Sequence, residues 1–137
     1  NLESCSDRFN TCQMTELEQP DYYTVHHLSV PCYMLQHNAY TQEGWLAAYD
    51  LLRRFVYEGF SPSQARAEAR ISADSGHRSW SFTRGAKLPG VELITWSLTI
   101  ADIRLDSADH YGKDVRAWAA GILVDSSELV SASRRET

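Results

Sequence analysis

The segment HHLSVPCYMLQH, residues 26–37, holds three histidines, a cysteine and a proline within twelve positions. Together with the residue before it, this segment carries one apolar stripe at helical spacing: Val25, Leu28, Cys32 and Leu35. Such spacing is typical of an amphipathic helix, so residues 21–37 are predicted to be helical. Pro31 has no amide hydrogen to donate to the carbonyl of residue 27. The helix therefore either kinks at Pro31 or restarts with Ser29 as its N-cap.

Two further helices are predicted, one on each side of this segment. Residues 6–18 would place Phe9, Cys12 or Gln13, and Leu17 on one face of a helix that ends before Pro20. The second helix begins at Thr41 as N-cap and ends at Gly59 as a left-handed stop. Its apolar stripe consists of Trp45, Ala48 or Tyr49, Leu52 and Phe55.

Helix-start signals recur in the second half of the chain. Ser61 and Gln64 form a capping box around Pro62, which predicts a surface helix ending near Ala73. A last long helix is expected from Ser107, with fraying after Ser126 where the residues become polar. Its buried face would consist of Tyr111, Val115, Trp118 and Ile122.

Between these two helices the apolar pattern changes. Residues 79–83 alternate small polar and aromatic side chains with the two-residue period of a strand, and residues 92–96 are a possible pairing partner. This pattern predicts a small hairpin or an irregular insertion at about 76–98. Thr99 and Asp102 then form a capping signature that opens a short helical turn. The expected fold is mainly α: a single domain over residues 1–137, a bundle of about five helices with that insertion.

Composition narrows the classes of function. A chain of 137 residues with 43% hydrophobic residues can bury one core, and its net charge of -5 argues against a nucleic-acid-binding surface. Three cysteines are too few and odd in number for a disulfide framework. No apolar run is long enough to cross a bilayer, so a cytoplasmic protein is expected.

The three histidines of residues 26–37 suggest a metal site, but helical geometry limits which of them can bind the same ion. His26 and His37 are eleven residues apart, which separates them by about 16 Å along a helix. A single zinc ion with ligand distances near 2.1 Å cannot reach both. A composite zinc site would instead combine Cys5 with His26 or His27 and with ligands from elsewhere. The alternative is that these histidines hydrogen-bond within a packed helix face.

Other candidate binding residues are aromatic. Tyr33 and His37 share a helix face, and Trp80 and Phe82 lie among basic residues that suit an anion or a base, or that form a solvated rim over buried rings. His110 lies among aspartates that suit acid–base chemistry or a helix N-terminus. A weaker alternative is a small-molecule pocket between helices, lined by Tyr22, Tyr23, Tyr33 and Trp45.

Four segments, VHHLSVPCYMLQH, GFSPSQARAEAR, LTIAD and VRAWA, resemble an uncharacterised bacterial family, a domain of unknown function. The resemblance runs from Cys5 to about Leu123. It implies a small helical cytoplasmic protein, and many members carry a C-P-x-C-G segment shortly before the cysteine that matches Cys5. Those cysteines, with Cys5 and His26 or His27, would complete a tetrahedral zinc site. The four residues before Cys5 contain no cysteine, which leaves that site half empty in the given sequence. Either the upstream ligands lie outside this sequence, or this member has lost the metal, or the family never bound one.

Two functional hypotheses follow. The first is a non-enzymatic helical protein that binds a protein partner or stabilises an assembly, with a structural zinc near the N-terminus. The alternative is a metal-dependent hydrolase or transferase of the helical-bundle type, in which His26 or His27 joins His77 or His110 around one ion. The first is favoured because titratable groups are scattered along the sequence rather than clustered at a readable spacing.

Overall fold

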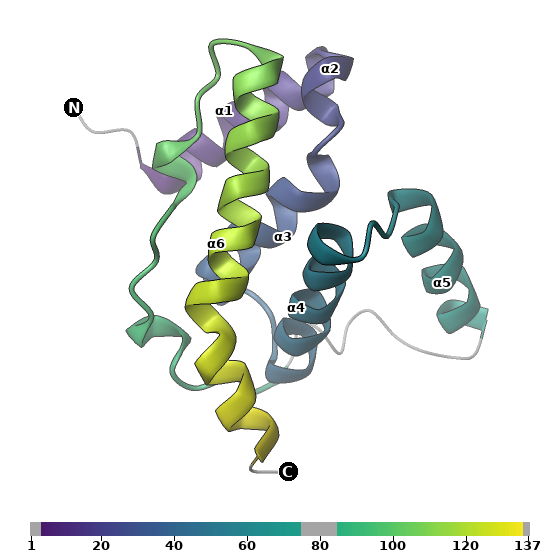
Figure 1. The fold of residues 1–137 in the computed structure, drawn as a ribbon, viewed down its shortest axis with the longest axis vertical. Coiled ribbons are helices and arrows are strands. Elements are labelled where there is room, and N and C mark those ends of the chain that lie inside the picture. The colour runs from purple at the N-terminus through teal and green to yellow at the C-terminus, as the bar shows by residue number, and fades with distance from the viewer. Residues whose placement is uncertain (1–3, 75–84, 136–137) are drawn as a thin grey trace.

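The long C-terminal helix, α6 (Ala108–Arg135), is the element against which most of the other helices pack. The computed structural model describes residues 4–74 and 85–135. With 28 residues, α6 is about 42 Å long and extends along most of the molecule (Figure 1). The residues of its predicted buried face are all buried: Tyr111, Val115, Trp118 and Ile122. Long as it is, α6 is not apolar enough to cross a membrane, and neither is any other helix of the described residues.

Three helices precede the first loop: α1 (Cys5–Glu18), α2 (Pro20–Tyr23) and α3 (His26–Gln36). The helices α2 and α3 contact α6, while α1 packs on α2 and on a short turn of the later chain. In Figure 1, α1 and α2 lie at the same end of the molecule as the start of α6. Of the two alternatives for Pro31, a restart at Ser29 is not observed, because α3 continues through the proline as one helix.

Helix α4 (Gln42–Tyr57) has the predicted cap and stop. The Thr41 hydroxyl accepts a hydrogen bond from the amide of Gly44 at 3.1 Å, and Gly59 has a positive φ of 66°. Trp45 donates its indole N–H to the carbonyl of Leu35 at 3.0 Å, which joins α4 to the end of α3. Through such contacts α4 packs against both α3 and α6.

Helix α5 (Pro62–Asp74) is the predicted surface helix. Its capping box is formed, because Ser61 N–H donates to Gln64 Oε1 at 2.8 Å and Gln64 N–H donates to Ser61 Oγ at 3.1 Å. Figure 1 shows α5 beside α4 and away from α6. An ion pair of 2.8 Å between Arg54 of α4 and Glu68 of α5 links the two helices.

Residues 85–107 run along α6 without a strand and contain two short 3-10 turns, η2 (Val91–Leu93) and η3 (Ile100–Asp102). The predicted capping box of Thr99 and Asp102 is formed at η3. At Gly90 the backbone φ of 97° lies in the left-handed region that favours glycine. The segment is held to the core by four buried side chains: Leu88, Val91, Ile100 and Ile103.

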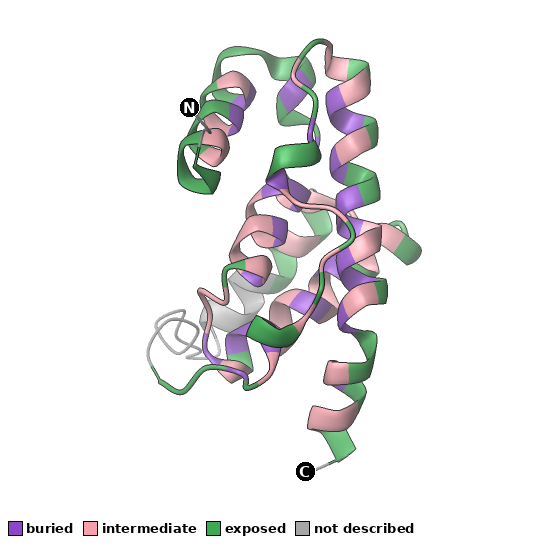
Figure 2. Ribbon diagram, turned by 90° about the vertical axis from the view of Figure 1, so that its left-hand side faces the viewer, coloured by how far each residue is buried: buried purple, intermediate pink, exposed green. Residues whose placement is uncertain are grey.

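The sequence predicted either a small hairpin or an irregular insertion at about 76–98. The part of this segment that the structure describes is irregular. The expected strand at 92–96 overlaps η2, and its expected partner at 79–83 lies outside the described residues. The last helix also does not fray after Ser126, because α6 stays helical to Arg135 and buries Val130. Figure 2 shows this mixture of buried and exposed positions along α6.

The apolar face predicted for α1 is wrong at its last position. Leu17 is 74% exposed, whereas its neighbour Glu16 is 1% exposed. One residue turns a helix by about 100°, so both cannot face the core. The position is taken by Glu16, because hydrogen-bond donors from two other helices meet its carboxylate.

Leu17 on α1 is exposed and Leu35 on α3 is buried, so truncating these two leucines should have unequal effects on stability. We expect Leu35→Ala, in the core, to lower the free energy of unfolding by about 2–5 kcal/mol. Leu17→Ala should change it by less than about 0.5 kcal/mol, because the side chain is exposed. Urea unfolding followed by far-UV circular dichroism measures both. Equal losses in the two variants would contradict the observed orientation of α1.

Candidate functional site

A buried carboxylate joins three helices. Glu16, in the last turn of α1, accepts a hydrogen bond from the hydroxyl of Tyr111 on α6. His26, the first residue of α3, places Nδ1 2.6 Å from the other carboxylate oxygen. Gln13 approaches that oxygen at 3.4 Å. We call Glu16, His26 and Tyr111 the Glu16 cluster.

The Glu16 carboxylate is the hydrogen-bond acceptor of this cluster, and it determines where the protons of its two partners lie. An ionised carboxylate only accepts hydrogen bonds, so the His26 proton lies on Nδ1. Burial and the hydrogen bond to Glu16 raise the pKa of Tyr111, so its hydroxyl remains a donor. The His26 ring stacks on Tyr23 with centroids 4.6 Å apart, and its side chain is about a third exposed. The cluster thus fixes an imidazole at the surface in one orientation.

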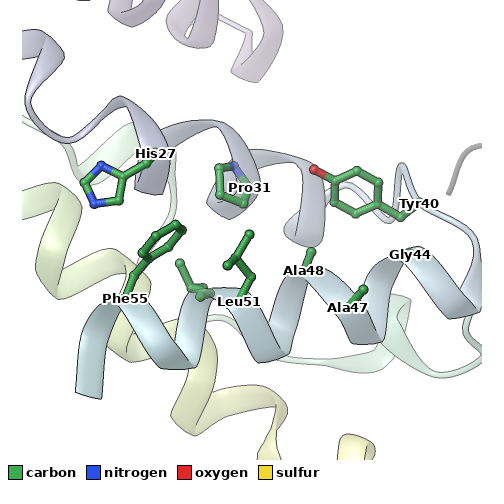
Figure 3. Close-up of a pocket in the computed structure, with 9 residues that line it drawn as sticks. His27, Pro31, Tyr40, Gly44, Ala47, Ala48, Leu51 and Phe55 are labelled. Atoms are coloured by element: carbon green, nitrogen blue, oxygen red, sulfur yellow. The ribbon is translucent and has the colours of Figure 1, made fainter. Parts of the chain in front are cut away.

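A pocket of about 390 Å³ lies between α3 and α4. Figure 3 shows its side chains converging from the two helices. On the α4 side, the lining residues form one stripe along the helix. The first three of them, Gly44, Ala47 and Ala48, are small. The lining residues are His27, Pro31, Tyr40, Gly44, Ala47, Ala48, Leu51, Leu52 and Phe55.

The two ends of the pocket carry its polar groups. His27 meets Phe55 edge-on at one end, with ring centroids 4.7 Å apart, and Tyr40 lies at the other end (Figure 3). Burial, together with the positive charges of Arg116 and His26, lowers the pKa of His27. Burial also raises the pKa of Tyr40. Both polar groups are therefore uncharged at neutral pH.

The sequence of the chain matches a known protein family. A family model described as a family of unknown function, DUF5946, matches residues 1–127. The chain belongs to this family. No curated protein and no solved structure matches it. The predicted resemblance to an uncharacterised family is thereby confirmed, while the expected C-P-x-C-G segment of its members stays a prediction.

The residues proposed as zinc ligands in this DUF5946 protein do not come together. Cys5 is exposed in the first turn of α1, eleven residues before Glu16, which places it about 16 Å from the Glu16 cluster along the helix. His26 uses Nδ1 for Glu16, and His27 faces the pocket. Within residues 4–74 and 85–135, no three His, Cys, Asp or Glu side chains are placed to hold a metal ion. The described residues alone therefore do not form the predicted zinc site.

The other predicted site residues fall into three groups. Tyr33 and His37 do meet, with ring centroids 4.1 Å apart, and Phe9 stacks on the other face of Tyr33 at 3.9 Å. His110 pairs with Asp106 at 3.0 Å near the start of α6. Three residues named from the sequence lie outside the described part of the chain: His77, Trp80 and Phe82.

Sequence reasoning missed both features described here. A pocket between helices was considered, but none of its four expected residues lines the pocket between α3 and α4: Tyr22, Tyr23, Tyr33 and Trp45. The available signal was the group of small residues Gly44, Ala47 and Ala48 in the first two turns of α4, of which Ala48 belongs to the predicted stripe. For the Glu16 cluster no local signal existed, because Tyr111 is 95 positions away in the chain.

Removing one hydroxyl tests the Glu16 cluster. We expect Tyr111→Phe to lower the free energy of unfolding by about 1.5–3 kcal/mol, because a buried carboxylate loses a donor. The matched control is Tyr22→Phe, whose buried hydroxyl donates to the backbone carbonyl of Leu105 at 2.9 Å. That loss should be about 0.5–1.5 kcal/mol, the range of a neutral hydrogen bond. Chemical unfolding of both variants gives the comparison, and a larger loss in Tyr22→Phe would rule out the role given to Glu16.

Proposed function

We propose that this protein is a non-enzymatic binding protein whose ligand is a small apolar molecule held in the pocket between α3 and α4. The supporting observation is the pocket itself. Its volume of about 390 Å³ falls in the range of about 300–1,000 Å³ that is usual for ligand sites. The proposal places the protein in the cytoplasm, where its three cysteines, which form no disulfide in the described residues, would stay reduced.

The chemistry of the lining supports binding rather than catalysis. Apart from His27 and Tyr40, all the lining residues are apolar, and an apolar ligand that covers them gains free energy by excluding water. The polar groups, His27 and Tyr40, stand at the two ends and can orient a ligand by hydrogen bonds. No serine, threonine, cysteine, lysine, aspartate or glutamate is among the lining residues, and the Glu16 cluster contributes no side chain to the pocket. The metal-dependent alternative draws no support from the described residues.

Filling the pocket tests this function. We expect the uncharged fluorescent probe N-phenyl-1-naphthylamine to bind the full chain at one site. The substitution Ala48→Leu should weaken this binding by about ten-fold or more, because each methylene group that the probe cannot bury removes about 0.8 kcal/mol. Ala47→Leu, on the same wall, should act in the same way. Fluorescence titration measures the affinity.

The control is Ala67→Leu, which adds the same side chain at an exposed position of α5. It should leave the affinity for the probe unchanged. Thermal unfolding of each variant shows whether the fold is retained. Equal probe binding by Ala48→Leu, Ala47→Leu and the unchanged chain would refute the proposed function.

A second candidate function is self-association, the assembly role that the sequence suggested. Its supporting observation is the α1–α2 surface, where Met14 is 60%, Leu17 74% and Tyr23 47% exposed. Met14 and Leu17 lie one turn apart on α1, so their side chains are neighbours. The proposed partner is a second copy of the chain, because a two-fold interface sets one apolar patch against itself.

This candidate predicts a dimer that a single charge disrupts. We expect light scattering to show dimers that increase with protein concentration, and Leu17→Lys to remain monomeric because it places two like charges in the interface. The matched control is Leu93→Lys, at a leucine of η2 that is 81% exposed. It should dimerise like the unchanged chain. A chain that is monomeric at every concentration, or a Leu17→Lys dimer, would dismiss self-association.

A further inference from the structure

The first turn of α3 is held only weakly by α3 itself. Its N-cap position is Val25, which makes no side-chain hydrogen bond to the first amides, whereas Ser4 caps α1 and Thr41 caps α4. Pro31 has no N–H, so the hydrogen bond that would join residue 31 to the carbonyl of His27 is missing as well. A turn without a side-chain cap and with one helical bond fewer rotates or kinks more easily than the rest of the helix.

A contact with another helix holds this turn in place. His26 lies with Nδ1 2.6 Å from Glu16 Oε1 on α1, and the Glu16 side chain is buried. Val25 and Leu28, before and after this contact in the sequence, are also buried, but apolar burial is non-directional. A hydrogen bond requires its donor and acceptor to be aligned. The contact between His26 and Glu16 therefore fixes the rotation of the turn about the axis of α3.

The residue after His26 forms one end of the pocket between α3 and α4. His27 lies edge-on against Phe55 of α4, with ring centroids 4.7 Å apart, and Figure 3 shows the two rings at one end of the lining. One residue turns a helix by about 100°, so His26 is directed to α1 while His27 is directed to α4. A rotation that breaks the contact of His26 would therefore also move His27 away from Phe55 and open that end of the pocket.

We infer that Glu16 and His26 are positioning residues of this pocket: their hydrogen bond holds the first turn of α3 so that His27 closes one end of the binding site. Neither Glu16 nor His26 lines the pocket, so both act through His27. This inference rests on the proposed function and names residues outside the pocket on which the affinity for its apolar ligand depends.

Two substitutions at His26 separate its hydrogen bond from its ring. His26→Phe keeps a ring that can stack on Tyr23 but has no donor for Glu16. His26→Asn loses the ring and keeps an amide N–H that can take the place of Nδ1–H. We expect His26→Phe to weaken binding of N-phenyl-1-naphthylamine by about five-fold or more, as for two coupled sites. His26→Asn should bind the probe like the unchanged chain in fluorescence titration.

A double-mutant cycle tests whether His26 acts through His27. His27→Ala removes the wall at one end of the pocket and should by itself weaken probe binding, because the probe loses apolar contacts there. When His26→Phe and His27→Ala are combined, the two losses should not add, because the side chain that His26 positions is already gone. Full addition of the two losses would show that His26 acts by another route and would overturn the inference.

The control for a general loss of stability is Tyr22→Phe. This variant removes the buried hydrogen bond from α2 to the carbonyl of Leu105 and should leave the affinity for the probe unchanged. Urea unfolding of every variant shows the conditions in which all the chains are folded during the titration. Equal weakening of probe binding by Tyr22→Phe and His26→Phe would contradict a specific role for His26.

An NMR measurement without ligand keeps the two proposals distinguishable. Nuclear Overhauser effects should connect the ring protons of His27 and Phe55 in the unchanged chain and in His26→Asn, and should weaken or vanish in His26→Phe. If the probe does not bind the unchanged chain, the proposed function fails, and this measurement alone decides whether Glu16 and His26 position His27. If the probe binds and His26→Phe keeps both its affinity and the ring contact, the proposed function stands and the positioning role is overturned.

Discussion

The carboxylate of Glu16 is the constraint on which the arrangement of α1, α3 and α6 depends. Removing such a group from water costs several kcal/mol unless donors replace the lost water. Those donors are the Tyr111 hydroxyl and His26 Nδ1, one from each of two other helices. Rotating α1 by one residue to bury Leu17 would leave both donors without their acceptor. The apolar side chain therefore stays in solvent, and the polar contact sets the orientation of α1.

The same constraint positions the pocket. His26 is held by Glu16 at the first turn of α3, and the next residue, His27, therefore faces the pocket between α3 and α4. Pro31 lies one turn further along that face, and its ring forms part of the pocket wall (Figure 3). On α4, the small side chains of Ala47 and Ala48, which lie toward Tyr40, do not fill the space between the helices (Figure 3). The pocket thus results from the fixed position of α3 and from the small residues on the side of α4 that faces it.

How much of this structure can be predicted depends on how far apart the interacting residues lie in the chain. Caps such as Thr41 and the Thr99–Asp102 pair depend on residues three positions apart, and each is formed as predicted. The buried stripe of α6 follows from its helical period in the same way. The inward position of Glu16 depends on Tyr111, which is 95 residues away. The pocket depends on space between two helices, and no local pattern describes that space.

Charge explains why two adjacent histidines behave differently. His26 has a carboxylate of the protein itself as partner, so the fold already satisfies its N–H. His27 has no such partner, and burial, followed by the positive charges of Arg116 and His26, lowers the pKa of its imidazole, which favours the neutral form.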